Sequence, residues 1–234
     1  MAFEAKRLVT SKVIFEARHI PIFDRNELLK AVTTGNIEDY DSAEEQGGAL
    51  RFLDLKKNVV LLIQNGRFGM DFEGSPDTTF FRSRIKSAYD AIAPKLPKKR
   101  FSHLGVRFQA YYAVEYKLDE LCELTSEKLL KRDMEIESIL AKKLDDMLYV
   151  TEYTSQGVRC RFQCAPITRK QLWQTIQISL GKEKKFVDSP EVSLYLDYDR
   201  YVQDTPAEVI ANFVETSHQQ GVKTLESICR YIFG

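Results

Sequence analysis

Two carboxylates that could act together lie in one predicted strand, VSLYLDYD, at residues 192–199. Asp197 and Asp199 fall on the same side of this strand, because successive side chains of a strand point to opposite faces. Such a pair could bind a divalent cation, which prefers carboxylate oxygens, or could form ion pairs with arginines. Arg159 and Arg161 alternate in the same way in a second predicted strand at 158–165. The ion-pair interpretation is therefore favoured, and no metal or other cofactor is predicted.

Further polar side chains accompany these aspartates if the strands at 105–111, 158–165 and 192–199 are neighbours. One face of the sheet would then carry Arg107, Gln109, Tyr111, Arg159, Arg161, Tyr195, Asp197 and Asp199. One interpretation is a solvated face with cross-strand ion pairs. The other is a binding surface whose arginines contact phosphate or carboxylate groups, with Tyr111 and Tyr195 stacking on a ligand. Both interpretations stay open at this point.

The sequence contains no recognisable catalytic constellation. No GxSxG, Walker A, GxGxxG or HExxH pattern occurs, and the three histidines are far apart along the chain. The cysteines form no CxxC pair and have no histidine nearby at zinc-ligand spacing, which indicates free thiols in a reducing compartment. They are Cys122, Cys160, Cys164 and Cys229. We predict no catalytic residue, and the sequence favours a non-enzymatic protein.

The charge balance limits the partners of this protein. Of the 234 residues, 34 are lysine or arginine and 34 are aspartate or glutamate. A neutral chain is not attracted in bulk to nucleic acid or to anionic lipid. The N-terminus lacks the apolar region of a signal peptide, and no apolar run approaches the length of a membrane span. We therefore expect a soluble cytoplasmic protein.

An internal duplication is indicated by two segments that align without a gap, residues 12–29 and 105–122. The identical pairs are Val13/Val106, Phe15/Phe108, Ala17/Ala110, Glu27/Glu120 and Leu28/Leu121. Each segment begins as a strand with alternating apolar residues and continues into a predicted helix. In the second copy this helix is expected to run on to about residue 144.

Hairpins and a closing helix follow in each copy. The pair Asn65-Gly66 predicts a type I′ turn, and residues 155–157 predict a second hairpin. Strands are also expected at 174–180 and 192–199. The closing helices start near the prolines at 76 and 206, and Gly221 is expected to interrupt the second one. The prediction is an α+β fold of duplicated β-α-β(3-4)-α units, 1–97 and 98–234, that form an antiparallel sheet with helices on one face.

The order of these elements, with the strand Leu104-Gly105-Val106-Arg107-Phe108 near mid-chain, resembles a sporadically distributed family of uncharacterised bacterial proteins. Members carry a Gly-[Val/Ile]-Arg-[Tyr/Phe] strand followed by an asparagine. This chain matches the strand but has Ala110 near the position where the asparagine would lie. The resemblance implies a bacterial, cytoplasmic origin and no established activity, and it points to Arg107. The duplicated plan is also similar to the fold of the TATA-binding protein, in which helices cover one face of a curved antiparallel sheet. Fold alone does not fix function.

We therefore expect a non-enzymatic binding or adaptor module that holds a protein partner or a small anionic ligand. One alternative is an enzyme or sensor that acts on a small nucleotide-like molecule through Asp197, Asp199 and an arginine. A second alternative is a sheet that binds nucleic acid, which the neutral charge disfavours. Self-association is a further expectation, because a long sheet has edges that another copy can cover.

Overall fold

A computed structural model describes residues 2–21, 30, 40–96, 99–130, 146–176 and 189–234. The described strands are β1 Leu8–Arg18, β2 Ser42–Gln46, β3 Ala49–Asp54, β4 Val59–Gln64, β5 Arg67–Glu73, β6 Arg100–Ala113, β7 Tyr149–Ser155, β8 Val158–Thr168 and β9 Val192–Pro206. The described helices are α2 Thr78–Ile92, α3 Leu118–Leu129, α5 Arg169–Thr175 and α6 Ile210–Phe233, with short 3₁₀ turns at Ala5–Arg7, Ala93–Lys95 and Ala207–Val209.

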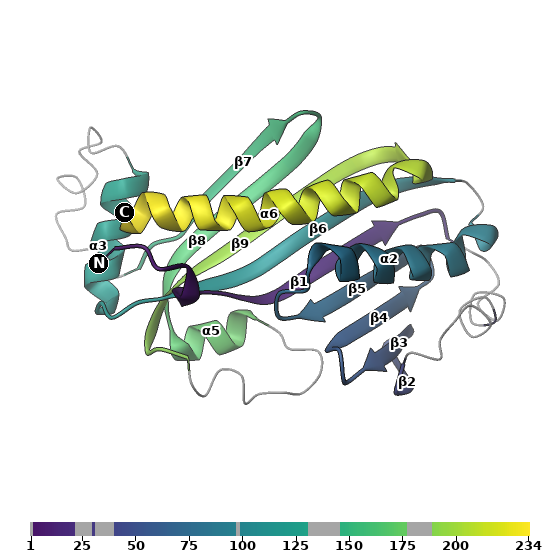
Figure 1. The fold of residues 1–234 in the computed structure, drawn as a ribbon, viewed down its shortest axis with the longest axis horizontal. Helices are drawn as coiled ribbons and strands as arrows, with labels where there is room; N and C mark the ends of the chain where they lie inside the picture. The colour runs from purple at the N-terminus through teal and green to yellow at the C-terminus, as the bar shows by residue number, and fades with distance from the viewer. Residues whose placement is uncertain (1, 22–29, 31–39, 97–98, 131–145, 177–188) are drawn as a thin grey trace.

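All described strands join one antiparallel sheet in the order β2-β3-β4-β5-β1-β6-β9-β8-β7. The α+β class and the antiparallel sheet are confirmed. The first strands of the two predicted units, β1 and β6, pair at its centre, and the sheet runs without a break across the predicted boundary at residues 97 and 98. Figure 1 shows α2 and α6 lying across the same face of the sheet.

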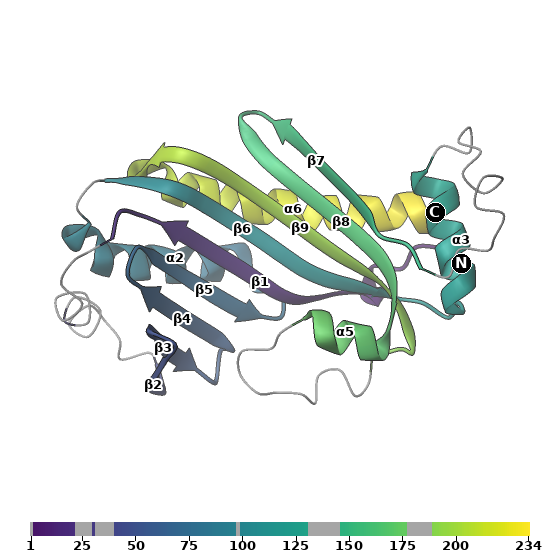
Figure 2. The ribbon, with the colours of Figure 1, turned by 180° about the vertical axis from the view of Figure 1, so that it is seen from behind.

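The prediction that helices cover only one face is wrong for α5. This short helix lies against the opposite face, at one end of the sheet (Figure 2). A small apolar cluster joins it there to β6, β8 and β9, and consists of Tyr111, Ala165, Ile167, Leu172, Ile176 and Tyr195. Apolar residues on both sides of the strands at this end favour a helix on each side.

The main core lies between the sheet and the pair α2 and α6. Val13, Phe15 and Ala17 of β1 are fully buried, as are the β6 residues on the same face, Val106, Phe108 and Ala110. Their alternation follows the two-residue period of a strand, so the predicted apolar face is confirmed. The side chain of Asp77 accepts a hydrogen bond from the backbone amide of Phe80 (2.9 Å), which caps the start of α2.

Helix α6 continues through Gly221, contrary to the predicted interruption. A Cβ atom added at Gly221 would lie 2.1 Å from Cε2 of Phe108. Gly221 therefore has no room for a side chain, because the Phe108 ring occupies that space. A contact between distant segments, rather than local backbone freedom, explains this glycine.

The predicted hairpins are confirmed, with a correction to the turn types. At Asn65-Gly66 only Gly66 has a positive φ (87°), so the turn is not type I′. Gln156 (52°) and Gly157 (77°) are both positive, and the type I′ geometry occurs between β7 and β8 instead.

Several predicted helical and strand residues have a different outcome. The segment 174–180 is not a strand at its start, because α5 extends to Thr175 and Ile176 caps it; residues 177–180 lie outside the described part. The prediction that α3 runs on to residue 144 is wrong at Leu130, because the helix ends at Leu129 and Leu130 has an extended backbone. Residues 131–145, and the first unit's predicted helix after β1 apart from Lys30, lie outside the described part. Within the described part, no helix is long and apolar enough to cross a membrane.

Candidate functional site

The predicted polar residues share one sheet face because β6, β9 and β8 are neighbours. Arg107 of β6 and Arg161 of β8 lie opposite Asp199 of β9, from its two sides. In the next row Gln109 and Gln163 flank Asp197 in the same way. We call the surface formed by Arg107, Gln109, Arg159, Arg161, Asp197 and Asp199 the polar face; it lies opposite to α2 and α6 and is turned to the viewer in Figure 2.

Asp197 and Arg107 form a two-point ion pair at the centre of the polar face. Nε of Arg107 donates to Oδ1 of Asp197 (2.8 Å), and Nη2 donates to Oδ2 (2.5 Å). The Asp197 side chain is only 4% exposed, whereas that of Arg107 is 42% exposed. This fork geometry is the strong form of an arginine–carboxylate contact. It raises the pKa of Arg107 above its ordinary value, chiefly through the hydrogen bonds that Arg107 donates to Asp197.

A second layer of hydrogen bonds fixes the orientation of Asp197. The hydroxyl of Tyr195 donates to Oδ2 of Asp197 (3.0 Å), and the side-chain amide of Gln109 donates to that hydroxyl (3.3 Å). Burial is the main reason that the pKa of Tyr195 is raised, with the Asp197 charge adding to it. The buried carboxylate is thus satisfied, as a buried charge must be.

The Asp199 side chain differs from that of Asp197, because it forms no hydrogen bond to any described residue. Burial raises the pKa of its carboxyl to about 6. The nearby charges of Asp197 and Glu16 also raise this pKa, while those of Arg107 and Arg161 lower it. Asp199 therefore titrates near neutral pH, and its protonation would remove one negative charge from between two arginines.

The two arginines of β8 are less constrained than Arg107. Nε of Arg161 lies 3.4 Å from Oε1 of Glu152 on β7, and both side chains are largely exposed. Arg159 is exposed, and no described residue forms an ion pair with it. Exposed pairs of this kind contribute little to stability, so both guanidinium groups are accessible to a partner.

Tyr111 and Tyr195 do not present open rings. They are 7% and 3% exposed, because α5 covers them with Leu172 and Ile176. A buried ring has no free face on which a base or other flat group could stack. The sequence placed both tyrosines on the correct face, but it did not show that α5 covers that end of the sheet.

Charged residues that were not assigned to the site extend the same surface onto β1 and β5. Glu16 lies near Asp199 and pairs with Arg18 and Arg67, at 2.5 and 3.1 Å. Its cross-strand neighbours are two glycines, Gly69 and Gly105, so no long side chain separates it from β5 and β6. The alternation of β1 already placed Glu16 opposite to the core, and this signal could have added it to the site.

The arrangement offers little for metal binding. Among the described residues there is no group of three or more histidine, cysteine, aspartate or glutamate side chains that could hold a metal ion. Asp197 is also committed to Arg107 on both of its oxygens. All four cysteines are free and buried. The chemistry that the polar face supports best is the recognition of an anion by arginine.

No protein-family model matches this chain, and among curated proteins none is significantly similar to it.

Proposed function

We propose that this protein is a non-enzymatic binding module whose polar face holds an acidic segment of a protein partner. The observation that carries the proposal is the way in which the Arg107 side chain is held in place while part of it stays exposed. Two of its nitrogens are fixed by the buried Asp197, and the third, Nη1, has no acceptor among the described residues although the side chain is 42% exposed. An arginine held in this way loses little further freedom when an anion binds to it.

The neighbouring arginines widen this anion-binding surface. Arg161 lies one strand away from Asp199, and Arg159 follows on the same face of β8. Spaced over β6 and β8, with β9 between them, these groups suit an extended partner with several carboxylates better than a single small anion. The neutral net charge of the chain favours a protein partner over nucleic acid, which requires many phosphate contacts.

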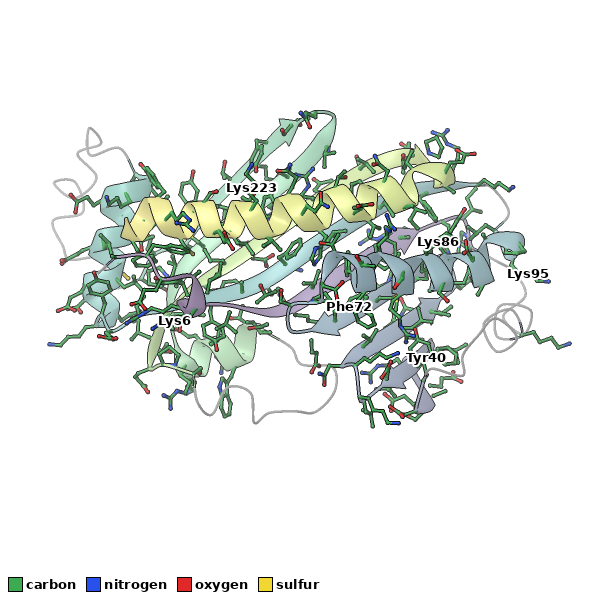
Figure 3. All side chains as sticks on the ribbon, viewed as in Figure 1. Lys6, Tyr40, Phe72, Lys86, Lys95 and Lys223 are labelled. Carbon is green, nitrogen blue, oxygen red and sulfur yellow. The ribbon has the colours of Figure 1, made fainter. Side chains whose placement is uncertain are left out.

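The test uses a biotinylated oligoglutamate peptide as the probe, with binding measured by biolayer interferometry at low salt. The double variant Arg159→Ala/Arg161→Ala should weaken binding by about tenfold or more, because two charge-assisted contacts are lost. The matched control is Lys86→Ala/Lys95→Ala, which removes two positive charges beside α2, on the other side of the sheet (Figure 3).

The outcomes separate the alternatives. Equal weakening by the two double variants would mean bulk electrostatic attraction and would contradict the proposal. Binding of inorganic phosphate but not of the peptide would favour a small anionic ligand. Salt-sensitive binding of DNA or RNA that depends on Arg159 and Arg161 would favour a nucleic-acid partner.

An enzyme or sensor for a small nucleotide-like molecule is the second candidate, and Asp199 is the observation that favours it. A carboxyl with a pKa of about 6 could accept or donate a proton near neutral pH. This role falls to Asp199 alone, because Asp197 is held by Arg107. Loss of nucleotide binding in Asp199→Asn, with oligoglutamate binding retained, would favour this candidate over the first.

Internal duplication also remains our proposal, and the central strand pair supports it. Ile14 of β1 lies opposite Arg107 of β6, and the gapless alignment makes these two positions equivalent. On either side of this pair, Val13 faces Phe108 and Phe15 faces Val106. In the alignment Val13 is equivalent to Val106 and Phe15 to Phe108, so the two pairs are related by exchanging the copies. Such an arrangement is what a two-fold axis between related halves produces.

Membership of the bacterial family and a cytoplasmic location are proposals too. The free cysteines favour the cytoplasmic location.

A further inference from the structure

A pocket opens on the other side of the sheet, between the β7–β8 hairpin and helix α6. Its volume is about 420 Å³, within the range of pockets that bind small organic ligands. The sheet wall is formed by alternate residues of β7, among them Tyr149 and Tyr153, together with Phe162 of β8. The helix wall is one side of the second half of α6, and Leu129 of α3 closes one end.

Two of the α6 residues that line the pocket have short side chains, which contributes to the space in it. Thr224 and Ser227 lie on this side of the helix, whereas the large apolar residues Val214 and Leu225 belong to the main core. The hairpin also diverges from α6 along its length (Figure 1), as the twist of a sheet requires. Small side chains opposite a diverging hairpin leave space that the described residues do not fill.

Hydrogen bonds and ring contacts hold the aromatic side chains around this space. The hydroxyl of Tyr153 lies 3.1 Å from that of the buried Tyr198, and the ring of Tyr149 packs at 6.3 Å from that of Phe162. The hydroxyl of Tyr231, another lining residue, donates to the backbone oxygen of Lys128 (3.0 Å). Fixed aromatic walls make the pocket pre-formed, which reduces the entropic cost of binding.

The charge of the lining selects the class of ligand. Lys223 is the one charged residue among the lining residues, and no described residue forms an ion pair with it. Figure 3 labels it on the side of α6 toward the hairpin. Thr224, the next residue of the helix, adds a hydroxyl to the same wall, while the opposite wall is largely aromatic.

We infer that this pocket binds an amphipathic monoanion, an apolar body with a carboxylate head. The body lies against Tyr149, Tyr153 and Phe162, and the carboxylate accepts hydrogen bonds from Lys223 and Thr224. The site is separate from the polar face: Phe162 points to the helix side of β8, whereas Arg161 and Gln163 point to the other side. The inference therefore does not depend on the proposed function.

The test measures the binding of decanoate and 2-naphthoate by isothermal titration calorimetry, with decanol and decyltrimethylammonium as neutral and cationic probes. Wild type should prefer the two carboxylates. Lys223→Gln should weaken their binding by about tenfold, the loss expected for a charge-assisted hydrogen bond, and should change decanol binding much less. Ser227→Trp should abolish the binding of every probe, because the indole fills the pocket.

The controls test whether any loss is local. Lys86→Gln removes a lysine from α2, and Arg159→Ala/Arg161→Ala alters only the polar face, so both should bind decanoate like wild type. Circular dichroism checks the fold of Ser227→Trp, and Thr224→Leu, a smaller change in the same wall, should weaken binding if the tryptophan variant does not fold.

The two carboxylates also distinguish the shape of the natural ligand. Tighter binding of 2-naphthoate indicates a flat aromatic body, and tighter binding of decanoate indicates an alkyl chain. Absence of binding by any probe would overturn the inference. So would equal binding of decanoate and decyltrimethylammonium, or decanoate binding that Lys223→Gln and Thr224→Leu leave unchanged.

Discussion

Arg107 and Asp197 show how a charged pair can be structural and functional at the same time. The carboxylate is almost fully buried on a face that the described helices leave largely uncovered, and the neighbouring side chains Arg107, Gln109 and Tyr195 enclose it. Removing one partner of a buried pair leaves an uncompensated charge, which is more costly than the loss of the attraction itself.

We predict that Arg107→Ala lowers the free energy of unfolding by roughly 3 kcal/mol, because it leaves Asp197 buried without its cation. Urea denaturation at pH 7 measures this change. Arg107→Ala/Asp197→Ala should lose less than the sum of the two single variants. Arg159→Ala is the control, and it should change stability by less than about 0.5 kcal/mol. Additive losses would mean that the two side chains do not stabilise each other.

The raised pKa of Asp199 gives a pH-dependent prediction. The folded chain holds this proton up to about pH 6, whereas an unfolded chain releases it near pH 4. Stability contributed by Asp199 therefore falls as pH rises between these values, since the folded state binds more protons there. Asp199→Asn, which stays neutral, should be more stable than wild type at pH 7.5, by roughly 1–3 kcal/mol.

The difference between wild type and Asp199→Asn should nearly vanish at about pH 3, where the Asp199 carboxyl is largely protonated in both the folded and the unfolded state. Urea denaturation at the two pH values measures the free energy of unfolding of both proteins. The contributions of the other carboxyl groups are the same in wild type and variant, so they cancel in the difference. An equal difference at both pH values would show that the side-chain amide, rather than the charge, is responsible.

At the scale of elements, the contact between α6 and the sheet is set by one glycine. Helix α6 runs for 24 residues across the sheet, and at Gly221 its backbone packs directly against the ring of Phe108. The same helix contacts α2 through His218, which lies 4.8 Å from the ring of Phe81 and 3.0 Å from the hydroxyl of Thr78. A shift of α6 would therefore disturb both halves of the core.

We predict that Gly221→Ala destabilises the protein, although alanine favours helix formation by about 1 kcal/mol. The added methyl group would lie 2.1 Å from Phe108, and overpacking of a core costs about 1–3 kcal/mol. Thermal denaturation measures the result. Gln219→Ala, at an exposed position of the same helix, should be neutral or slightly stabilising. Combining Gly221→Ala with Phe108→Leu should recover part of the loss, and a stabilised single variant would contradict the assigned contact.

At the scale of the whole molecule, the two predicted units are parts of one folded body. The long β1–β6 pairing lies at the centre of the sheet, and α6 of the second unit packs against α2 of the first. An ion pair between Arg82 and Glu215 (2.6 Å) adds to this contact. Each unit alone would expose one side of its central strand and part of its core.

We predict that fragments 1–97 and 98–234 do not unfold cooperatively when each is expressed alone, because each loses the central strand pair and the α2–α6 contact. An equimolar mixture should regain helical circular dichroism and a cooperative thermal transition. Cooperative unfolding of fragment 1–97 by itself would instead mean that the units are independent domains.

The sequence by itself determined the features that depend on local periodicity. The alternation in β1, β6, β8 and β9 identified which side chains face the core, and the hairpin between β4 and β5 was predicted from Asn65-Gly66. These predictions succeed because a strand places successive residues on opposite faces whatever its neighbours are. The polar residues of β6, β8 and β9 were therefore placed on one face before their partners were known.

Only the tertiary structure decided which of these residues meet. The pairing of Arg107 with Asp197, the lack of a hydrogen-bonded partner for Asp199 and the covering of Tyr111 by α5 depend on strand order and register between distant segments. The role of Gly221 depends on Phe108 in the same way, and the pocket beside α6 depends on the course of a hairpin relative to a helix. Local patterns carry no information about such distances, because they result from the packing of the whole chain.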